Sequence, residues 1–238
     1  MRKFKNMIKK IFNFFGFQII RQESQELTFG NLTFLNIKKN DVIFDLGCHI
    51  GSTIEEINKI WPQAKVYGFE PFKEFANKCH KRFLDNSQIE ICQIAISDRK
   101  GYSNLTTSNY ALSLHGNNLS TNYKGNSKTK VRTIKLDNFV DERKINNIRL
   151  IKIDVEGHEL AVLKGMKNLL STQKVDVIVC EVMFVEHFKG QALFLELSKF
   201  LEKFGYLIFD IRQLKRTSNK QLRFGNCVYI SSRIFRKL

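Results

Sequence analysis

Two carboxylates and an imidazole stand where a buried strand is expected to turn into a helix. Residues 150–153 form a short, mostly apolar run, and from Glu159 onward apolar residues recur at helical spacing. Asp154, Glu156 and His158 lie between the two. Such groups can take a proton from a hydroxyl or bind a cationic part of a ligand. The alternative is that the acids only stabilise the amino terminus of the helix.

A second polar group lies near the end of an earlier expected strand. Asp45 lies in the buried run 42–46, and Gly47 and Gly51 separate this run from a helical pattern at 52–60. Glycine lets the backbone turn sharply and approach a ligand closely. The G-x-x-x-G spacing differs from the G-x-G-x-x-G that binds a pyrophosphate, which the carboxylate would repel. A ligand with an ammonium group or a positive charge suits it better, and S-adenosylmethionine carries both an amino group and a sulfonium.

A third acidic residue, Glu70, follows the strand-like run 65–69, about 25 residues after Asp45. This is where an acidic side chain accepts hydrogen bonds from ribose hydroxyls in nucleotide-binding folds. Pro71 has a backbone angle suited to opening a helix. Ligands of open α/β sheets bind at the carboxyl ends of the strands, so three such ends in order favour a nucleotide-like cofactor.

These segments together resemble the FkbM-type methyltransferases, which use S-adenosylmethionine and mostly methylate hydroxyl oxygens, often of sugars. The resemblance covers roughly residues 41–211. It implies an α/β fold with a doubly wound, mostly parallel, seven-stranded sheet, the Rossmann-like class I methyltransferase fold. The matching stretches are FDLGCHIG at 44–51, GFEPF at 68–72, IAISDRKG at 94–101, TIKLDNF at 133–139, IKIDVEGHELAVLKG at 151–165 and VIVCEVM at 177–183.

The resemblance also implies a set of site residues. A sugar hydroxyl is a poor nucleophile near neutral pH, so a base beside it is expected. The candidates for that base are Asp154, Glu156, His158 and Glu181. His158 could instead face solvent, Glu181 could be an ion-pair partner, and no spacing demands a metal. The residues expected to bind the cofactor are Asp45, Gly47, Cys48, His49, Gly51, Glu70, Pro71, Ile94, Ala95 and Asp154.

The apolar patterns alternate between strand and helix, which indicates a parallel sheet covered on both faces, with the final strand antiparallel. One methyltransferase domain, residues 29–238, is expected after a leading segment, 1–28. The expected strands are 42–46, 65–69, 89–94, 149–153, 175–181, 206–211 and 226–231, with strand-like pieces near 101–106 and 129–135. The expected helices are 52–60, 72–84, 158–170 and 190–204, with a short helix that Asp137 caps.

Charge is concentrated at the two ends of the chain. The net charge is +16, yet residues 1–22 and 211–238 hold fourteen basic groups and no acid, so the centre is nearly neutral. A protein that follows a nucleic-acid backbone would be expected to carry basic groups around its site as well. The nearly neutral centre counts against nucleic-acid binding. An RNA methyltransferase that binds through its basic termini is therefore kept as the second hypothesis and not the first. The third is a non-catalytic, membrane-associated adaptor, which the retained acids disfavour.

The leading segment predicts an amphipathic helix, since Phe4, Met7, Ile8 and Ile11 share one face and lysines the other. We expect it to contact an anionic membrane peripherally or to pack on the domain or a second subunit. Five scattered cysteines favour a reducing compartment, hence a cytoplasmic protein, with peripheral contact at the inner face of a membrane as an option. The polar segment 104–128 favours a loop that binds a carbohydrate acceptor, with disorder as the alternative.

Overall fold

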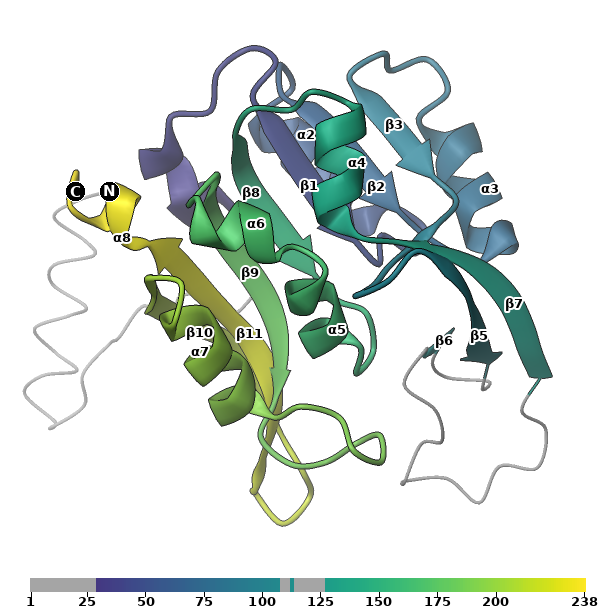
Figure 1. The fold of residues 1–238 in the computed structure, drawn as a ribbon, viewed down its shortest axis with the longest axis vertical. Helices are drawn as coiled ribbons and strands as arrows, with labels where there is room; N and C mark the ends of the chain where they lie inside the picture. Colours follow the sequence, from purple (N-terminus) through teal and green to yellow (C-terminus); the bar gives the residue numbers. More distant parts are fainter. Residues whose placement is uncertain (1–28, 108–111, 114–126) are drawn as a thin grey trace, which may run out of the picture.

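The computed structural model describes residues 29–107, 112–113 and 127–238. Its centre is a seven-stranded sheet in the order β10-β11-β9-β8-β1-β2-β3 (Figure 1). The strands are β1 (Val42–Leu46), β2 (Lys65–Phe69), β3 (Ile89–Cys92), β8 (Ile148–Ile153), β9 (Val175–Met183), β10 (Tyr206–Arg216) and β11 (Leu222–Ser231). β1, β2, β3, β8 and β9 run parallel, and β11 pairs antiparallel with both β9 and β10. The predicted seven-stranded, mostly parallel sheet is confirmed.

Helices cover both faces of this sheet, as Figure 1 shows. On one face, Phe44 and Ile151 pack in a cluster with apolar side chains of α4 (Leu136–Glu142), α5 (Glu159–Lys164), α6 (Lys167–Ser171) and α7 (Phe194–Glu202). On the other, Ile43 and Leu150 pack with side chains of the 3-10 helix η1 (Phe29–Leu35), α2 (Ser52–Ile60) and α3 (Lys73–Arg82). A short α8 (Ser232–Phe235) ends the described fold. Strands buried on both faces explain the apolar runs in the sequence.

This two-sided packing also decides where the polar residues of the strands point. Successive side chains of a strand face opposite sides of its sheet. Asp45 therefore shares the face of Ile43, and Lys152 that of Leu150, so both project toward η1 and α2. Glu181 lies on the same face, two residues after Val179 in β9.

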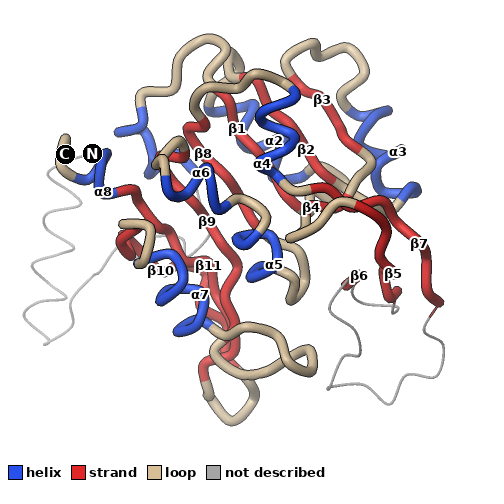
Figure 2. Tube along the Cα trace, viewed as in Figure 1, coloured by secondary structure: helices blue, strands red, loops and turns tan. Residues whose placement is uncertain are grey.

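A smaller sheet lies beside the first, in the order β4-β7-β5-β6. Its strands are β4 (Ala95–Ile96), β5 (Gly101–Thr107), β6 (Leu112–Ser113) and β7 (Ser127–Ile134). β5 and β7 form an antiparallel arm that extends away from the main sheet (Figure 2). The strand-like pieces expected near 101–106 and 129–135 are thus a pair. The leading helix, and Tyr110, His115 and Tyr123 of the polar segment, lie outside the described residues.

Two local predictions were wrong. The helix expected at 158–170 is divided into α5 and α6 around Gly165, which lies so close to the chain that a Cβ there would be 2.0 Å from the Ser97 carbonyl oxygen. Asp137 does not cap its own helix, α4. Its carboxylate instead accepts hydrogen bonds from the N–H groups of Asn168 (3.1 Å) and Leu169 (3.0 Å) and so caps α6.

Other element boundaries differ by a few residues. The helix expected at 190–204 spans only α7, and β3 ends two residues before the predicted 94. β10 and β11 extend well beyond the predicted 206–211 and 226–231 and form a long hairpin. None of the helices in the described part of the chain is long and apolar enough to cross a membrane.

Candidate active site

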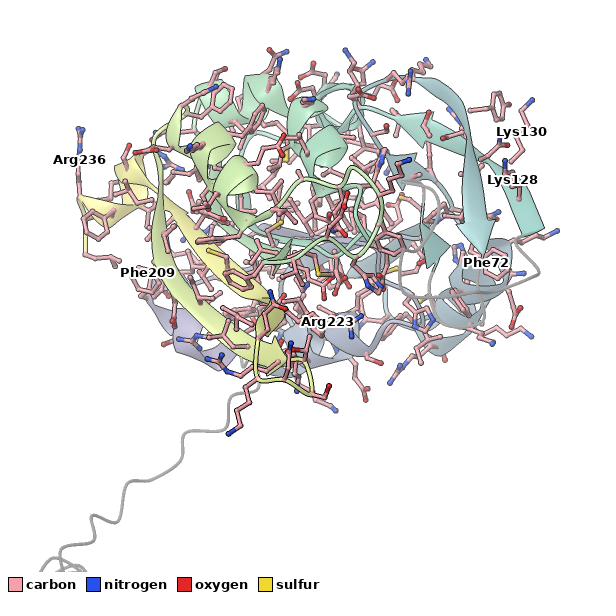
Figure 3. All side chains as sticks on the ribbon, turned by 90° about the horizontal axis from the view of Figure 1, so that it is seen from below. Phe72, Lys128, Lys130, Phe209, Arg223 and Arg236 are labelled. Atoms are coloured by element: carbon pink, nitrogen blue, oxygen red, sulfur yellow. The ribbon has the colours of Figure 1, made fainter. Side chains whose placement is uncertain are left out.

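The carboxyl ends of β1, β2, β8 and β9 meet at one edge of the sheet, and acidic residues stand at each of them. Asp45 is near the end of β1, Glu70 follows β2, Asp154 follows β8 and Glu181 is near the end of β9. Figure 3 views the molecule from this side, with Arg223 in the middle and Phe72 toward the small sheet. The predicted strand-end residues are therefore gathered at a single edge.

The loop after β1 is held in place by backbone hydrogen bonds. The N–H groups of Gly47 and Cys48 both donate to the Phe69 carbonyl, at 2.9 and 3.1 Å. Gly47 has a φ of +88°, and a Cβ there would be 1.9 Å from the Asp154 carbonyl oxygen. Only glycine permits such a close approach. The loop therefore packs directly against the end of β8, and Gly51, at φ +83°, opens α2.

Glu70 organises two neighbouring segments. Its carboxylate oxygens accept hydrogen bonds from the His49 N–H (3.0 Å) and the Phe72 N–H (2.8 Å). The side chain is buried, and this burial raises its pKa, while the two N–H groups oppose the shift. Each carboxylate oxygen has a second lone pair, so Glu70 retains the capacity to accept a hydroxyl donor.

Asp45 is fully buried, and neither of its carboxylate oxygens has a hydrogen-bond donor among the described residues. Burial raises its pKa to about 7; Lys152 opposes this shift, and Asp154 and Glu70 add to it. A buried carboxylate without donors is unfavourable unless it is neutral or meets a cation. This unpartnered group is what an ammonium-bearing cofactor would satisfy.

Lys152 is a site residue that the sequence patterns did not reveal. It lies directly across from Asp45 in the pairing of β1 with β8, and its Nζ is 3.1 Å from Asp154 Oδ2. Burial alone lowers the pKa of Lys152, but the carboxylates of Asp154, Glu181 and Asp45 outweigh burial, so the pKa is raised. A charged lysine thus stands among the acids. Its only signal in the sequence is a basic residue inside an apolar strand.

The four candidates for the base fall into two groups. Asp154, Glu156 and Glu181 influence each other electrostatically and lie together. His158 lies at the start of α5, with its Nε2 3.0 Å from the Oγ of buried Ser97, which precedes the arm. The structure therefore places the three carboxylates around Lys152 and gives the imidazole a separate hydroxyl partner.

Burial raises the pKa of both Glu156 and Glu181. Burial, with Asp154 and Glu159 adding to it, raises the pKa of Glu156 to about 7. Burial, again with Asp154, raises the pKa of Glu181 well above its usual range. Glu159 binds the N–H groups of Gly157 (3.0 Å) and Val155 (3.3 Å) and so shapes the loop that carries Glu156. The φ of +52° at Glu156 shows how sharply this loop turns.

The remaining predicted cofactor residues surround the same loop and the small sheet. Cys48 is buried, and a Cβ at Gly68 would lie 3.0 Å from its Sγ. Ala95 packs in an apolar cluster against Phe72, next to the half-buried Pro71. Ile94 packs at the border of the core on the α4 face. In the described part of the chain, no group of three His, Cys, Asp or Glu side chains has the geometry of a metal site.

Fold and site together define a Rossmann-like, S-adenosylmethionine-dependent methyltransferase. Residues 45–208 match the family described as methyltransferase FkbM domain, and the chain belongs to this family. It is 30% identical over 167 residues to the 2-O-methyltransferase NoeI of Sinorhizobium fredii, covering 65% of this chain and 68% of NoeI. It is 30% identical over 149 residues to the hexuronic acid methyltransferase AglP of Haloferax volcanii, covering 61% of this chain and 57% of AglP.

Solved structures show the same fold at low sequence identity. The precorrin-6y C5,15-methyltransferase of Geobacter metallireducens superposes with a TM-score of 0.50 at 12% identity, covering 90% of both chains. Fibrillarin of Methanococcus jannaschii superposes with a TM-score of 0.50 at 14% identity, covering 82% of this chain and 67% of fibrillarin. The cofactor of the chain is S-adenosylmethionine, and the unpartnered Asp45 and the closely packed glycine loop suit it.

Proposed function

We propose that the protein transfers the methyl group of S-adenosylmethionine to a hydroxyl oxygen of a sugar, in a glycan, a lipid-linked saccharide or a similar metabolite. The observation that carries this proposal is the relationship to NoeI, named for transfer to an oxygen, and to AglP, named for a hexuronic acid. The family match spans every acidic residue at the carboxyl edge of the sheet.

Three parts of the chain would hold the cofactor. The carboxylate of Asp45 binds the amino group of the methionine moiety, because it is buried and unpartnered. The loop from Gly47 to Gly51 lets the backbone come close. Glu70 accepts the ribose hydroxyls with its remaining lone pairs. When bound, S-adenosylmethionine supplies a methyl group that is already electrophilic.

The protein must then position the acceptor oxygen and remove its proton. Good positioning alone supplies several kcal/mol of the barrier. A base works best when its pKa is near the working pH, and the pKa of Glu156 is about 7. Glu156 also lies with Asp154 and Glu181 at the carboxyl edge of the sheet. We therefore assign the base to Glu156.

The polar segment 104–128 is part of this proposal. β5 and β7, which lead into it and out of it, are described, and most of the segment itself is not. Its amide, hydroxyl and aromatic side chains suit contacts with a carbohydrate. We expect it to contribute to acceptor binding.

The test offers the full chain S-adenosylmethionine with a labelled methyl group. The acceptors are monosaccharides, uronic acids, a glycolipid extract and total RNA in separate reactions, analysed by mass spectrometry. We expect the label in a methyl ether of a sugar and its loss in an Asp45→Asn variant. Label found in RNA alone would replace this function with RNA methylation. Tight cofactor binding with no labelled product from any extract would favour the non-catalytic adaptor.

A further inference from the structure

Two amide side chains lie next to the acidic edge, buried Asn226 and half-buried Gln213, and neither is among the residues proposed to hold the cofactor. Asn226 of β11 is directly across from Glu181 in the pairing with β9. It is only 7% exposed. Its Nδ2 donates to Gln213 Oε1 at 2.6 Å, but its own Oδ1 is buried and has no donor among the described residues. A buried carbonyl oxygen left without a donor is unfavourable.

The backbone of β10 is distorted where it brings Gln213 to this place. The pairing of β10 with β11 shifts register between Arg212 and Lys215, and Gln213 has a φ of +50°. Positive φ is strained for a residue with a side chain. Bulges of this kind redirect a side chain and are frequent next to active sites. Here the distortion aims Gln213 at Asn226.

Neighbouring β11 accommodates the distortion with a glycine. A Cβ at Gly225 would lie 2.8 Å from Leu214 Cδ2 and 2.9 Å from the Arg212 carbonyl oxygen. β10 and β11 thus approach more closely than side chains on both strands would permit. The strained backbone at Gln213 and the close approach of the strands at Gly225 therefore both favour the arrangement in which the Gln213 and Asn226 amides are hydrogen-bonded.

The amide pair continues the row of polar groups that begins at the cofactor. Asn226 lies two residues before Val228, which packs on the face that also carries Ile43 and Leu150. Asp45, Lys152, Glu181 and Asn226 therefore project from one face of the sheet, in the order of their strands. Asp45 marks the cofactor end of this row. Asn226 and Gln213 mark the end that the cofactor residues leave unused.

We propose that Asn226, positioned by Gln213 and beside Glu181, binds a hydroxyl group of the acceptor next to the one that is methylated. The inference rests on the proposed function and adds how the acceptor is recognised: as a molecule with neighbouring hydroxyls. A hydroxyl donates to the unpartnered Oδ1 of Asn226 and can exchange a hydrogen bond with Glu181. A site built to bond a hydroxyl rejects an analogue that lacks it, since the buried group is then unpaired.

The test compares Asn226→Leu with Gln88→Leu in the full chain. Gln88 also has a buried, unpartnered Oε1, but it precedes β3 and so lies at the opposite, amino edge of the sheet. The probes are methyl glucoside, methyl mannoside and methyl glucuronoside, each with its deoxy analogues. The measurements are kcat and KM for each acceptor, cofactor affinity by calorimetry, and Tm.

For an acceptor that the wild type methylates, we expect Asn226→Leu to raise KM about ten- to a hundredfold, the cost of one unsatisfied buried polar group, with cofactor affinity and Tm nearly unchanged. The wild type should show the same rise for one deoxy analogue, and for that analogue the variant should match the wild type. Gln88→Leu should leave the KM for every acceptor unchanged. If Asn226→Leu does not fold, Gln213→Gly relieves the strained φ, removes the amide and tests the same KM.

Two results would overturn the inference in different ways. If the wild type methylates a sugar and Asn226→Leu discriminates the deoxy analogues as the wild type does, the amide pair is only structural and the proposed function stands. If the wild type binds and methylates none of the sugars, the proposed function fails and the subsite fails with it.

Discussion

We propose Asp45 as the residue on which cofactor binding depends most directly, because it is buried and both of its oxygens lack donors among the described residues. We expect Asp45→Asn to weaken S-adenosylmethionine binding by about ten- to a hundredfold, since a hydrogen bond to a charged group contributes about 1.5–3 kcal/mol. Calorimetry measures the change. Asp141→Asn, on the exposed side of α4, is the matched control. Equal affinity in the wild type, Asp45→Asn and Glu70→Ala would contradict this placement of the cofactor.

Asp45 should also make the affinity for S-adenosylmethionine depend on pH. This dependence distinguishes the effect of the charge of Asp45 from the effect of its shape. The pKa of Asp45 is raised to about 7, so below that pH the free protein holds a proton that a cationic ligand must displace. The affinity for S-adenosylmethionine should therefore rise with pH, by at most about tenfold per unit, and level off above about pH 7. In Asp45→Asn this rise should shrink, and what remains belongs to the neighbouring acids.

Glu156 is predicted to act in the chemical step and not in cofactor binding. With a pKa of about 7, its carboxylate is increasingly ionised as the pH rises, so kcat should rise and level off above neutrality. Glu156→Gln should lower kcat by about a hundredfold or more and remove this rise, because the amide cannot accept the proton. A pH–rate profile with saturating cofactor tests both. If Glu156→Gln keeps the wild-type pH–rate profile, Glu156 is not the base, and Asp154, His158 and Glu181 are the candidates to test next.

Sequence patterns predicted the acids of the site but not the groups between them. Asp45 lies near the end of an apolar run, and Glu70 and Asp154 each follow one, so their place at a strand end could be predicted from local pattern. Lys152 and Asn226 stand alone inside apolar strands, where nothing local gives them a partner. Their proposed roles depend on register, which pairs Lys152 with Asp45 and Asn226 with Glu181 through contacts far apart in the chain.

Among the elements, α6 depends on a side chain from a different helix. Asp137 of α4 accepts two N–H groups of α6 and is itself 8% exposed. Asp137→Ala should lower the free energy of unfolding by about 1–2 kcal/mol, as the loss of a helix cap does. Urea unfolding measures this change, and Asp141→Ala on the same helix is the control. Cofactor affinity should not change; a stability equal to the wild type would show that water replaces the cap.

The elements differ in how much local sequence determines them. β1, β2 and α2 were predicted at their observed boundaries, because each has an apolar pattern bounded by glycine, proline or polar residues. The break between α5 and α6 could not be predicted, because the Ser97 carbonyl that crowds Gly165 comes from a remote segment. The hairpin of β10 and β11 was predicted too short, because much of β10 is partly exposed and lacks a simple apolar alternation.

At the scale of the whole molecule, the basic carboxyl terminus lies close to the start of the described fold. Ile234 of α8 and Phe34 of η1 pack against the same apolar cluster. Asp176 forms ion pairs with both Arg149 and Arg233, and Arg149 also binds the carbonyl of Leu35, at the end of η1. The carboxyl terminus therefore lies beside η1, the element that follows the leading segment (Figure 1).

The position of the carboxyl terminus beside η1 bears on the prediction of peripheral membrane contact. Phe235 and Leu238 are 51% and 63% exposed, next to Arg236 and Lys237, on the side where residues 1–28 join the domain. The sequence of residues 4–15 has the basic and apolar pattern of a lipid-binding helix, and we propose that these exposed groups add to its contact with anionic lipid, where each basic group contributes about 1 kcal/mol. We expect the full chain to float with anionic liposomes and to be released by salt.

A chain that begins at Glu23 should float much less with the same liposomes, because it lacks the amphipathic stretch and keeps only the basic carboxyl terminus. Neutral liposomes are the control, and on them both chains should remain in the dense fraction. Cofactor affinity, measured on both chains, confirms that the shortened domain is folded. Equal flotation of the two on anionic liposomes would show that the leading segment does not provide the contact, and would favour its packing on the domain or on a second subunit.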